Sequence, residues 1–150
     1  MLEYVESLLL EYGYQGLFVA SFLASTVLPF GSEGFLVFLV SRGLNVLAVI
    51  LVASVGNFLG SCTTYYIGMK GRKYVERVLH VKPSDMEKAG KYFYKYGSYA
   101  LLLSWLPVVG DLLVVMAGIL RLRLATFSVL VFVGKFLRYL VVAYAAHILL

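Results

Sequence analysis

The stretch Leu28-Pro29-Phe30-Gly31-Ser32-Glu33-Gly34 interrupts an apolar run that extends over residues 13–41. A helix of that length reaches about 43 Å, whereas the hydrocarbon core of a bilayer is about 30 Å thick. Pro29 and Gly31 break helices, and the piece on either side of them is too short to cross. Broken backbone at membrane depth is tolerated only where protein or water satisfies it, so the stretch predicts a re-entrant helical hairpin with Glu33 at its tip.

The composition places this hairpin in a membrane protein. Hydrophobic residues make up 61% of the 150 residues, charged residues only 14%, and the mean hydropathy is +0.89. A soluble domain has a smaller apolar share and a larger charged share. We therefore expect an all-α integral membrane protein that forms one domain, residues 1–150, with about four membrane segments. A short amphipathic helix over residues 2–11 is expected to precede them at the membrane surface.

Most of the positive charge lies in one connector, residues 70–95. The Lys and Arg residues of this connector are Lys70, Arg72, Lys73, Arg77, Lys82, Lys88, Lys91 and Lys95. By the positive-inside rule it is cytoplasmic, and the chain is a multi-pass protein of the cytoplasmic membrane. A basic loop beside membrane spans is a topology signal, so we do not expect a nucleic-acid partner. Pro83 divides the connector into two amphipathic surface helices, and Ser84 with Glu87 predicts a capping box at the start of the second.

The first full-length apolar helix is expected over residues 46–69. Gly56, Gly60, Thr64 and Gly68 recur along it at every fourth position, which places them on one face. Such a stripe of small residues lets another helix approach closely. We interpret it as a helix-packing surface.

The second half of the chain repeats the first. A shift of 78 positions superposes Pro29 on Pro107, Glu33 on Asp111, Gly56 on Gly134, Phe58 on Phe136, Leu59 on Leu137 and Tyr66 on Tyr144. Repeat 1 covers about residues 13–69 and repeat 2 about residues 97–150, where Pro107 and Gly110 mark the second break. Paired interrupted segments of this kind indicate a transporter-like site at the interface of two repeats.

The number of crossings decides how the two units are related. If each interrupted run enters and leaves on one side, only residues 46–69 cross before the connector, and the second unit starts from the opposite face. The repeat is then inverted, and Glu33 and Asp111 approach the midplane from opposite sides. Arg121 and Arg123 then lie on the cytoplasmic side, as the positive-inside rule favours, whereas four full crossings would place them outside.

The last apolar helix is expected over residues 124–150. Lys135 and Arg138 lie in its body, where a charge costs at least about 2.5 to 3.5 kcal/mol. Glu33 and Asp111 are the acids available to pair with them at membrane depth. One interpretation is an ion-pair network that only holds helices together. Buried pairs are poor stabilisers and intramembrane charges usually mark pathways, which favours a functional site. Arg138 and Lys135 suit an anion such as phosphate, and the two acids suit proton exchange or gating.

The sequence offers no constellation for catalysis or metal binding. Cys62, His80 and His147 are separated along the chain, and no Ser/His/Asp pattern accompanies them. We therefore expect a transporter rather than an enzyme, with no metal and no cofactor.

Several stretches of the chain resemble the DedA proteins, which belong with the VTT or SNARE-associated membrane proteins. The resemblance is to their small YqaA-like branch in particular. The resemblance rests on residues 28–33, 56–60, 66–68, 105–111, 118 and 134–139. It implies opposed re-entrant hairpins in an inverted repeat and translocation of lipids, with bacterial members linked to polyprenyl (undecaprenyl) phosphate and to the proton-motive force. Glu33 matches the family motif. Ser104 and Gly110 stand where typical members carry arginines, and Asn45 stands where they carry a second acid.

We therefore predict a lipid translocase, of flippase or scramblase type, that moves an anionic phospholipid or a polyprenyl phosphate such as undecaprenyl phosphate. Arg138 and Lys135 hold the headgroup, while Glu33 and Asp111 couple protons or gate the path. A proton-coupled transporter of a small solute or drug is the alternative. The expected partners are membrane lipid and protons, and the sequence leaves open whether copies form a homo-oligomer.

Overall fold

The computed structural model describes residues 3–4, 7, 11–26, 32–106 and 108–149, and these residues form helices without a strand. The elements are α2 (Gly13–Thr26), α3 (Ser32–Ser41), α4 (Val46–Met69), α5 (Arg72–Leu79), α6 (Pro83–Tyr96), the 3₁₀ helix η1 (Gly97–Trp105), α7 (Val109–Ile119) and α8 (Leu124–Leu149). The breaks predicted at Pro29, Gly31 and Pro107 lie outside the described residues, as does most of the surface helix expected over residues 2–11.

Two helices, α4 and α8, are long and apolar enough to cross a membrane. Each leaves a row of large apolar side chains exposed at every fourth position. The rows are Leu47, Leu51, Val55 and Leu59 on α4, and Val129, Val133, Leu137 and Val141 on α8. A soluble protein would bury such rows in its core, whereas lipid can cover them. An all-helical chain with two apolar helices of spanning length is therefore confirmed.

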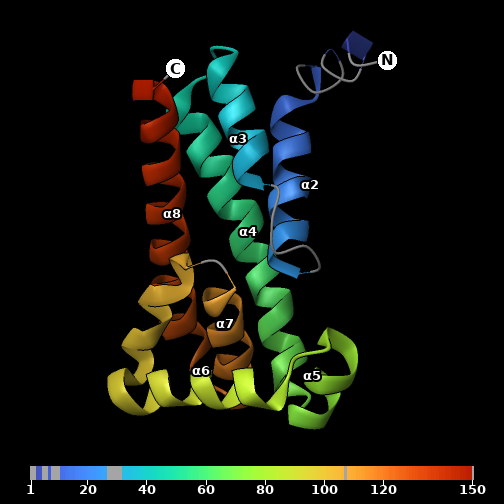
Figure 1. Cartoon of the computed structure of the whole chain (residues 1–150), viewed down its shortest axis with the longest axis vertical. Coiled ribbons are helices and arrows are strands. Elements are labelled where there is room, and N and C mark those ends of the chain that lie inside the picture. The colour runs from blue at the N-terminus through green and yellow to red at the C-terminus, as the bar shows by residue number, and fades with distance from the viewer. Residues whose placement is uncertain (1–2, 5–6, 8–10, 27–31, 107, 150) are drawn as a thin grey trace.

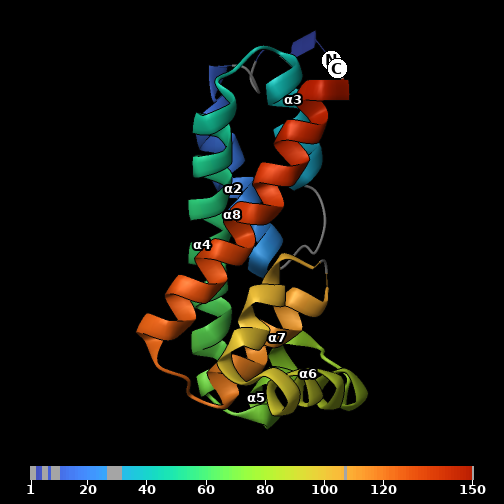
Figure 2. The same cartoon turned by 90° about the vertical axis from the view of Figure 1, so that its left-hand side faces the viewer.

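A shorter helical pair packs at each end of these long helices (Figure 1). α4 runs from the end that holds both termini to the end that holds α5 and α6, and α8 runs back. α2 and α3 lie at the first end, and η1 and α7 lie at the second. In each pair the first helix runs toward the middle of the molecule and the second runs away from it (Figure 2).

Each pair builds its own apolar core with one half of α4 and α8. At the end near the termini, α2 and α3 contribute Leu17, Leu36 and Leu39, all with no exposed surface. At the other end, η1 and α7 contribute Leu101 and Leu113, which are equally enclosed. The polar side chains at the tips of the two helical pairs therefore lie between the two cores, in the middle of the molecule.

The small residues of α4 face two different partners. A Cβ on Gly56 would lie 2.6 Å from the carbonyl oxygen of Phe18 in α2, and one on Gly68 would lie 2.5 Å from that of Val115 in α7. Gly60 is at least as tightly placed against Phe22 of α2. Thr64 donates a hydrogen bond of 3.0 Å to the carbonyl oxygen of Ser25. The stripe thus holds α4 against both helical pairs, because only backbone-sized residues fit there.

The start of α4 agrees with the prediction from the sequence, and the start of α6 does not. Asn45 caps α4 through a 3.0 Å hydrogen bond from the backbone N–H of Ala48 to its side chain. The capping box predicted at Ser84 was wrong, because α6 begins one residue earlier at Pro83, with Lys82 as the N-cap and no side-chain cap. Proline at the first helical position has no N–H to satisfy and a φ already suited to the helix.

Candidate functional site

Two ion pairs join α8 to the two short helices α3 and α7. The ammonium nitrogen of Lys135 donates a hydrogen bond to Asp111 Oδ1 at 3.2 Å. One turn further along α8, Arg138 forms an ion pair with Glu33. The structure therefore pairs the four predicted intramembrane charges two by two, one acid and one cation for each helical pair.

The cations are enclosed, and the acids are more open. The side chain of Lys135 is 1% exposed and that of Arg138 is 12% exposed, against 29% for Asp111 and 26% for Glu33. A buried ammonium group is costly without a partner, so Asp111 offsets part of the cost of burying Lys135. Each acid is therefore the more accessible member of its pair, although the Glu33 Oε1 atom that faces Arg138 is itself buried.

Both acids occupy the first turn of their helices, Glu33 in α3 and Asp111 in α7. The free backbone N–H groups and the helix dipole make this end of a helix electropositive, which favours a carboxylate there. Each ion pair therefore combines a side-chain cation with a helix N-terminus. The same combination favours an anion in place of the carboxylate.

A pocket of about 220 Å³ opens beside Asp111. The end of α2 contributes Ser25 and Thr26, α4 contributes Thr64, and α7 contributes Asp111 and Leu112. The pocket therefore lies where the tips of the two helical pairs meet. It combines hydroxyl groups with one carboxylate and apolar walls, which suits water or a small polar group.

A second polar group adjoins Glu33. The hydroxyl oxygens of Tyr139 and Ser32 lie 2.8 Å apart, and both residues are buried. Asn57 donates a 3.1 Å hydrogen bond to the carbonyl oxygen of Ser21, and the side chains of Ser21 and Asn57 face the Tyr139 hydroxyl. Ser21 Oγ and Asn57 Oδ1 are buried without a hydrogen-bond partner within the described part of the chain. Buried polar atoms of this kind call for water or a ligand.

Sequence reasoning missed the role of Tyr139 and Ser32. Tyr139 appears in the sequence as one more aromatic residue of an apolar helix, and Ser32 as part of a break. The available signal was positional, because Tyr139 follows Arg138 directly and Ser32 directly precedes Glu33. An ion pair between Arg138 and Glu33 also brings their sequence neighbours Tyr139 and Ser32 close together.

The other predicted residues are placed as packing or surface groups. Gly110 lies against the backbone of Ser104, and a Cβ on Gly134 would lie 2.5 Å from Ser104 Oγ. Arg121 donates a hydrogen bond of 3.4 Å to the carbonyl oxygen of Met69, at the end of the molecule that holds the connector. Among the described residues, no three His, Cys, Asp or Glu side chains gather as a metal site.

Comparison with known proteins identifies relatives of this chain. Residues 28–148 match the VTT domain family. The inner membrane protein YqaA of Escherichia coli is 38% identical over 132 residues, which cover 86% of this chain and 87% of that protein. An uncharacterized protein of Haemophilus influenzae is 43% identical over 133 residues, covering 82% and 80%. Undecaprenyl phosphate transporter A of Staphylococcus aureus is 26% identical over 137 residues, covering 83% and 68%. No solved structure matches the chain.

Proposed function

Because this chain belongs to the VTT domain family, the DedA membrane proteins, we propose that it translocates an anionic phospholipid or a polyprenyl phosphate across the cytoplasmic membrane. The observation that carries the proposal is the pair of enclosed cations on α8, each held by an acid that stays partly open. The name of the Staphylococcus aureus relative supports the substrate class. We propose a transporter rather than an enzyme, since the two ion pairs at the site suit the exchange of charged groups.

The helix bounds support an inverted repeat of two re-entrant hairpins. The shift of 78 positions carries α3 onto residues 110–119 and α4 onto residues 124–147, which lie within α7 and α8. The contacts correspond as well, since α2 packs on α4 as η1 packs on α8, and α3 packs on α8 as α7 packs on α4. An inverted repeat requires such units to approach from opposite ends of the molecule.

The distribution of charge supports a cytoplasmic connector. The basic helices α5 and α6 lie at the end of the molecule where α7 joins α8 through Arg121 and Arg123. Arg42 follows α3 at the other end. The positive-inside rule assigns the end with more Lys and Arg to the cytoplasm.

Charge exchange gives a mechanism for headgroup passage. A phosphate that enters beside Asp111 or Glu33 competes with the carboxylate for the cation behind it, and the helix N-terminus favours either anion. Protonation of the carboxylate removes the competitor and releases the cation to the phosphate. The planar guanidinium of Arg138 binds phosphate through two hydrogen bonds, and Lys135 adds a compact charge. Proton coupling follows if the acid must be protonated for each headgroup that passes.

Proteoliposomes that contain a fluorescent polyprenyl phosphate test this proposal. We expect the wild type to move the probe between leaflets and Arg138→Ala to slow that movement at least tenfold. Arg121→Ala is the matched control, because Arg121 lies at the surface and should retain the wild-type rate. Equal rates for wild type and Arg138→Ala would refute the role of the enclosed cations.

A further inference from the structure

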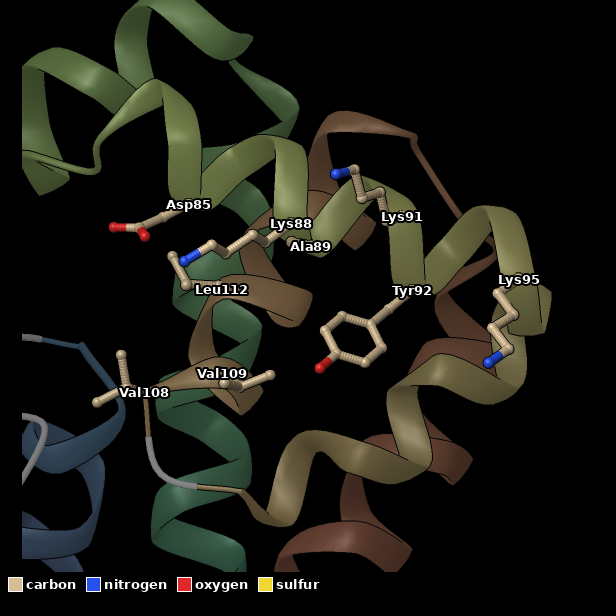
Figure 3. A pocket seen from close by; sticks show the side chains of 9 residues that line it. All are labelled: Asp85, Lys88, Ala89, Lys91, Tyr92, Lys95, Val108, Val109 and Leu112. Carbon is tan, nitrogen blue, oxygen red and sulfur yellow. The ribbon is translucent and has the colours of Figure 1, made fainter.

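A second pocket, about 390 Å³ in volume, lies between α6 and the start of α7 (Figure 3). Its α6 side carries Lys88, Lys91 and Lys95, and its α7 side carries Val109 and Leu112. It is separate from both ion pairs, and neither the repeat nor the proposed charge exchange uses it. A pocket of this size accommodates a small ligand.

The α6 side of this pocket is positively charged. Lys88, Lys91 and Lys95 recur at spacings of three and four residues, which places them along one side of the helix. Within the described ranges none of the three forms an ion pair with a carboxylate, and Lys95 lies over the ring of Tyr96 at 5.2 Å. Among the described residues that line the pocket, Asp85 is the one acid. The lysines therefore outweigh it and favour an anionic ligand.

The opposite wall is apolar. Figure 3 shows the ring of Tyr92 pointing toward Val109, and Leu112 lying below the amine of Lys88. A free inorganic anion gains nothing from such a wall, whereas an amphiphile buries hydrocarbon against it. The Tyr92 hydroxyl lies near the apolar wall and provides a hydrogen-bond donor. The lining therefore matches an anionic headgroup attached to an acyl or isoprenoid chain.

The position of the pocket fits a lipid in the bilayer interface. α6 lies across the ends of the two long helices (Figure 1). Tyr92, Tyr94 and Tyr96 of α6 and Tyr99 of η1 are all exposed. Tyrosine is enriched where the hydrocarbon core meets the headgroups. These tyrosines favour a position of α6, and of the pocket beside it, at headgroup level.

We propose that this pocket binds the phosphate of an anionic lipid in the leaflet beside α6 and delivers it toward Asp111. Val108 and Leu112 line both this pocket and the one beside Asp111, so the two adjoin along the first turns of α7. The binding step stands on the pocket alone. The delivery step rests on the proposed translocase function.

Binding is measured by titrating the full-length protein in detergent into phosphatidic acid with a fluorescent acyl chain, followed by anisotropy. Each lysine near a phosphate is worth about 1 kcal/mol, or about fivefold in Kd. We expect Lys88→Gln/Lys91→Gln/Lys95→Gln to raise the Kd at least tenfold. The matched control, Lys70→Gln/Lys73→Gln/Lys82→Gln, removes the same charge from exposed positions that do not line the pocket, and should change the Kd less than threefold. Equal changes in the two variants would overturn the site in favour of general attraction to the connector.

Two competitors identify the ligand. Phosphatidylcholine with the same labelled chain should bind at least tenfold more weakly, because its headgroup has no net charge. Inorganic phosphate at millimolar concentration should leave the phosphatidic acid bound. Displacement by inorganic phosphate would assign the site to a free anion, and tight binding of phosphatidylcholine would assign it to the hydrocarbon chain; either result overturns the proposal.

Transport by the same variants separates the two proposals. Arg138→Ala leaves the three lysines of the pocket in place, so it should raise the Kd for phosphatidic acid less than the pocket variant does while slowing transport at least tenfold. The pocket variant should impair both binding and transport. A wild type that binds phosphatidic acid but moves no lipid would remove the translocase function and leave the pocket standing. A pocket variant with a raised Kd and a wild-type transport rate at low lipid concentration would overturn the delivery step.

Discussion

Asp111→Ala should destabilise the protein more than any other single change at the two ion pairs. It leaves the ammonium group of Lys135, 1% exposed, without its partner. Removing one member of a buried pair costs about 3–5 kcal/mol. Because 29% of Asp111 is exposed and water reaches the pair from that side, we take the lower end, about 3 kcal/mol. At about 2–4 °C per kcal/mol, Tm should fall by about 6–12 °C.

The reverse change should cost less. Lys135→Met removes the enclosed charge and leaves an acid that water reaches, so we expect a loss of about 1 kcal/mol. In the double variant Asp111→Ala/Lys135→Met neither charge of this pair remains, and its stability should lie within about 1 kcal/mol of the wild type. The order of stability, rather than the absolute values, is the prediction.

Cys62 provides the assay. It is the single cysteine of the chain and lies partly buried in α4, so a thiol-reactive fluorogenic dye reports unfolding on heating. Glu76→Ala, which removes the exposed pair with Arg72, is the control and should shift Tm by about 2 °C or less. The reasoning fails if Asp111→Ala is no less stable than Lys135→Met, or if the two losses simply add in the double variant.

Three further changes test the packing, the polar group and the topology. Gly60→Ala should lower the free energy of unfolding by about 1–3 kcal/mol, because the new Cβ meets the backbone of Phe22. Gly34→Ala, with open space around it, should be neutral or stabilising. Equal thermal shifts for the two variants would contradict the close packing of α2 on α4. Tyr139→Phe should lower the free energy of unfolding, measured by chemical denaturation, by about 1 kcal/mol through the lost hydrogen bond to Ser32. Adding Ser32→Ala to this variant should cost little more, and additive losses would argue against that bond. Single cysteines at Arg42, His80 and Arg123 in a Cys62→Ser background, probed with an impermeant thiol reagent, should label 80 and 123 from one side and 42 from the other; labelling of 42 and 123 from a common side would refute the inverted repeat.

The sequence predicted the long helices well, because their signal is local. The helix expected over residues 46–69 has those bounds, and the one expected over 124–150 is α8. Uninterrupted apolar length suffices to predict such elements. The pairing of two acids with two cations was also predictable, since few charges were available at that depth.

The remaining features depend on contacts between distant residues. The 3₁₀ geometry of η1 does not follow from an apolar sequence, which is equally compatible with an α-helix. The hydrogen bond between Ser32 and Tyr139 joins residues 107 positions apart, and no periodicity indicates it. The pocket between α6 and the start of α7 likewise forms only when the amphipathic helix α6 packs against α7. Local pattern assigns elements, and the faces that meet are decided by the fold.

Under the proposed repeat, the two long helices correspond to each other but have different tasks. The shift of 78 positions places Lys135 at Asn57 and Arg138 at Gly60. On α4 a side chain at Gly60 would meet the backbone of Phe22, so that position can only pack. On α8 the equivalent position is open enough for a guanidinium group and its pair with Glu33. An arginine at position 60 would separate α2 from α4, whereas a glycine at 138 would leave Glu33 without its partner. In the proposed function the charged path therefore lies along α8, and α4 packs against α3 and α7, the helices that carry the two acids.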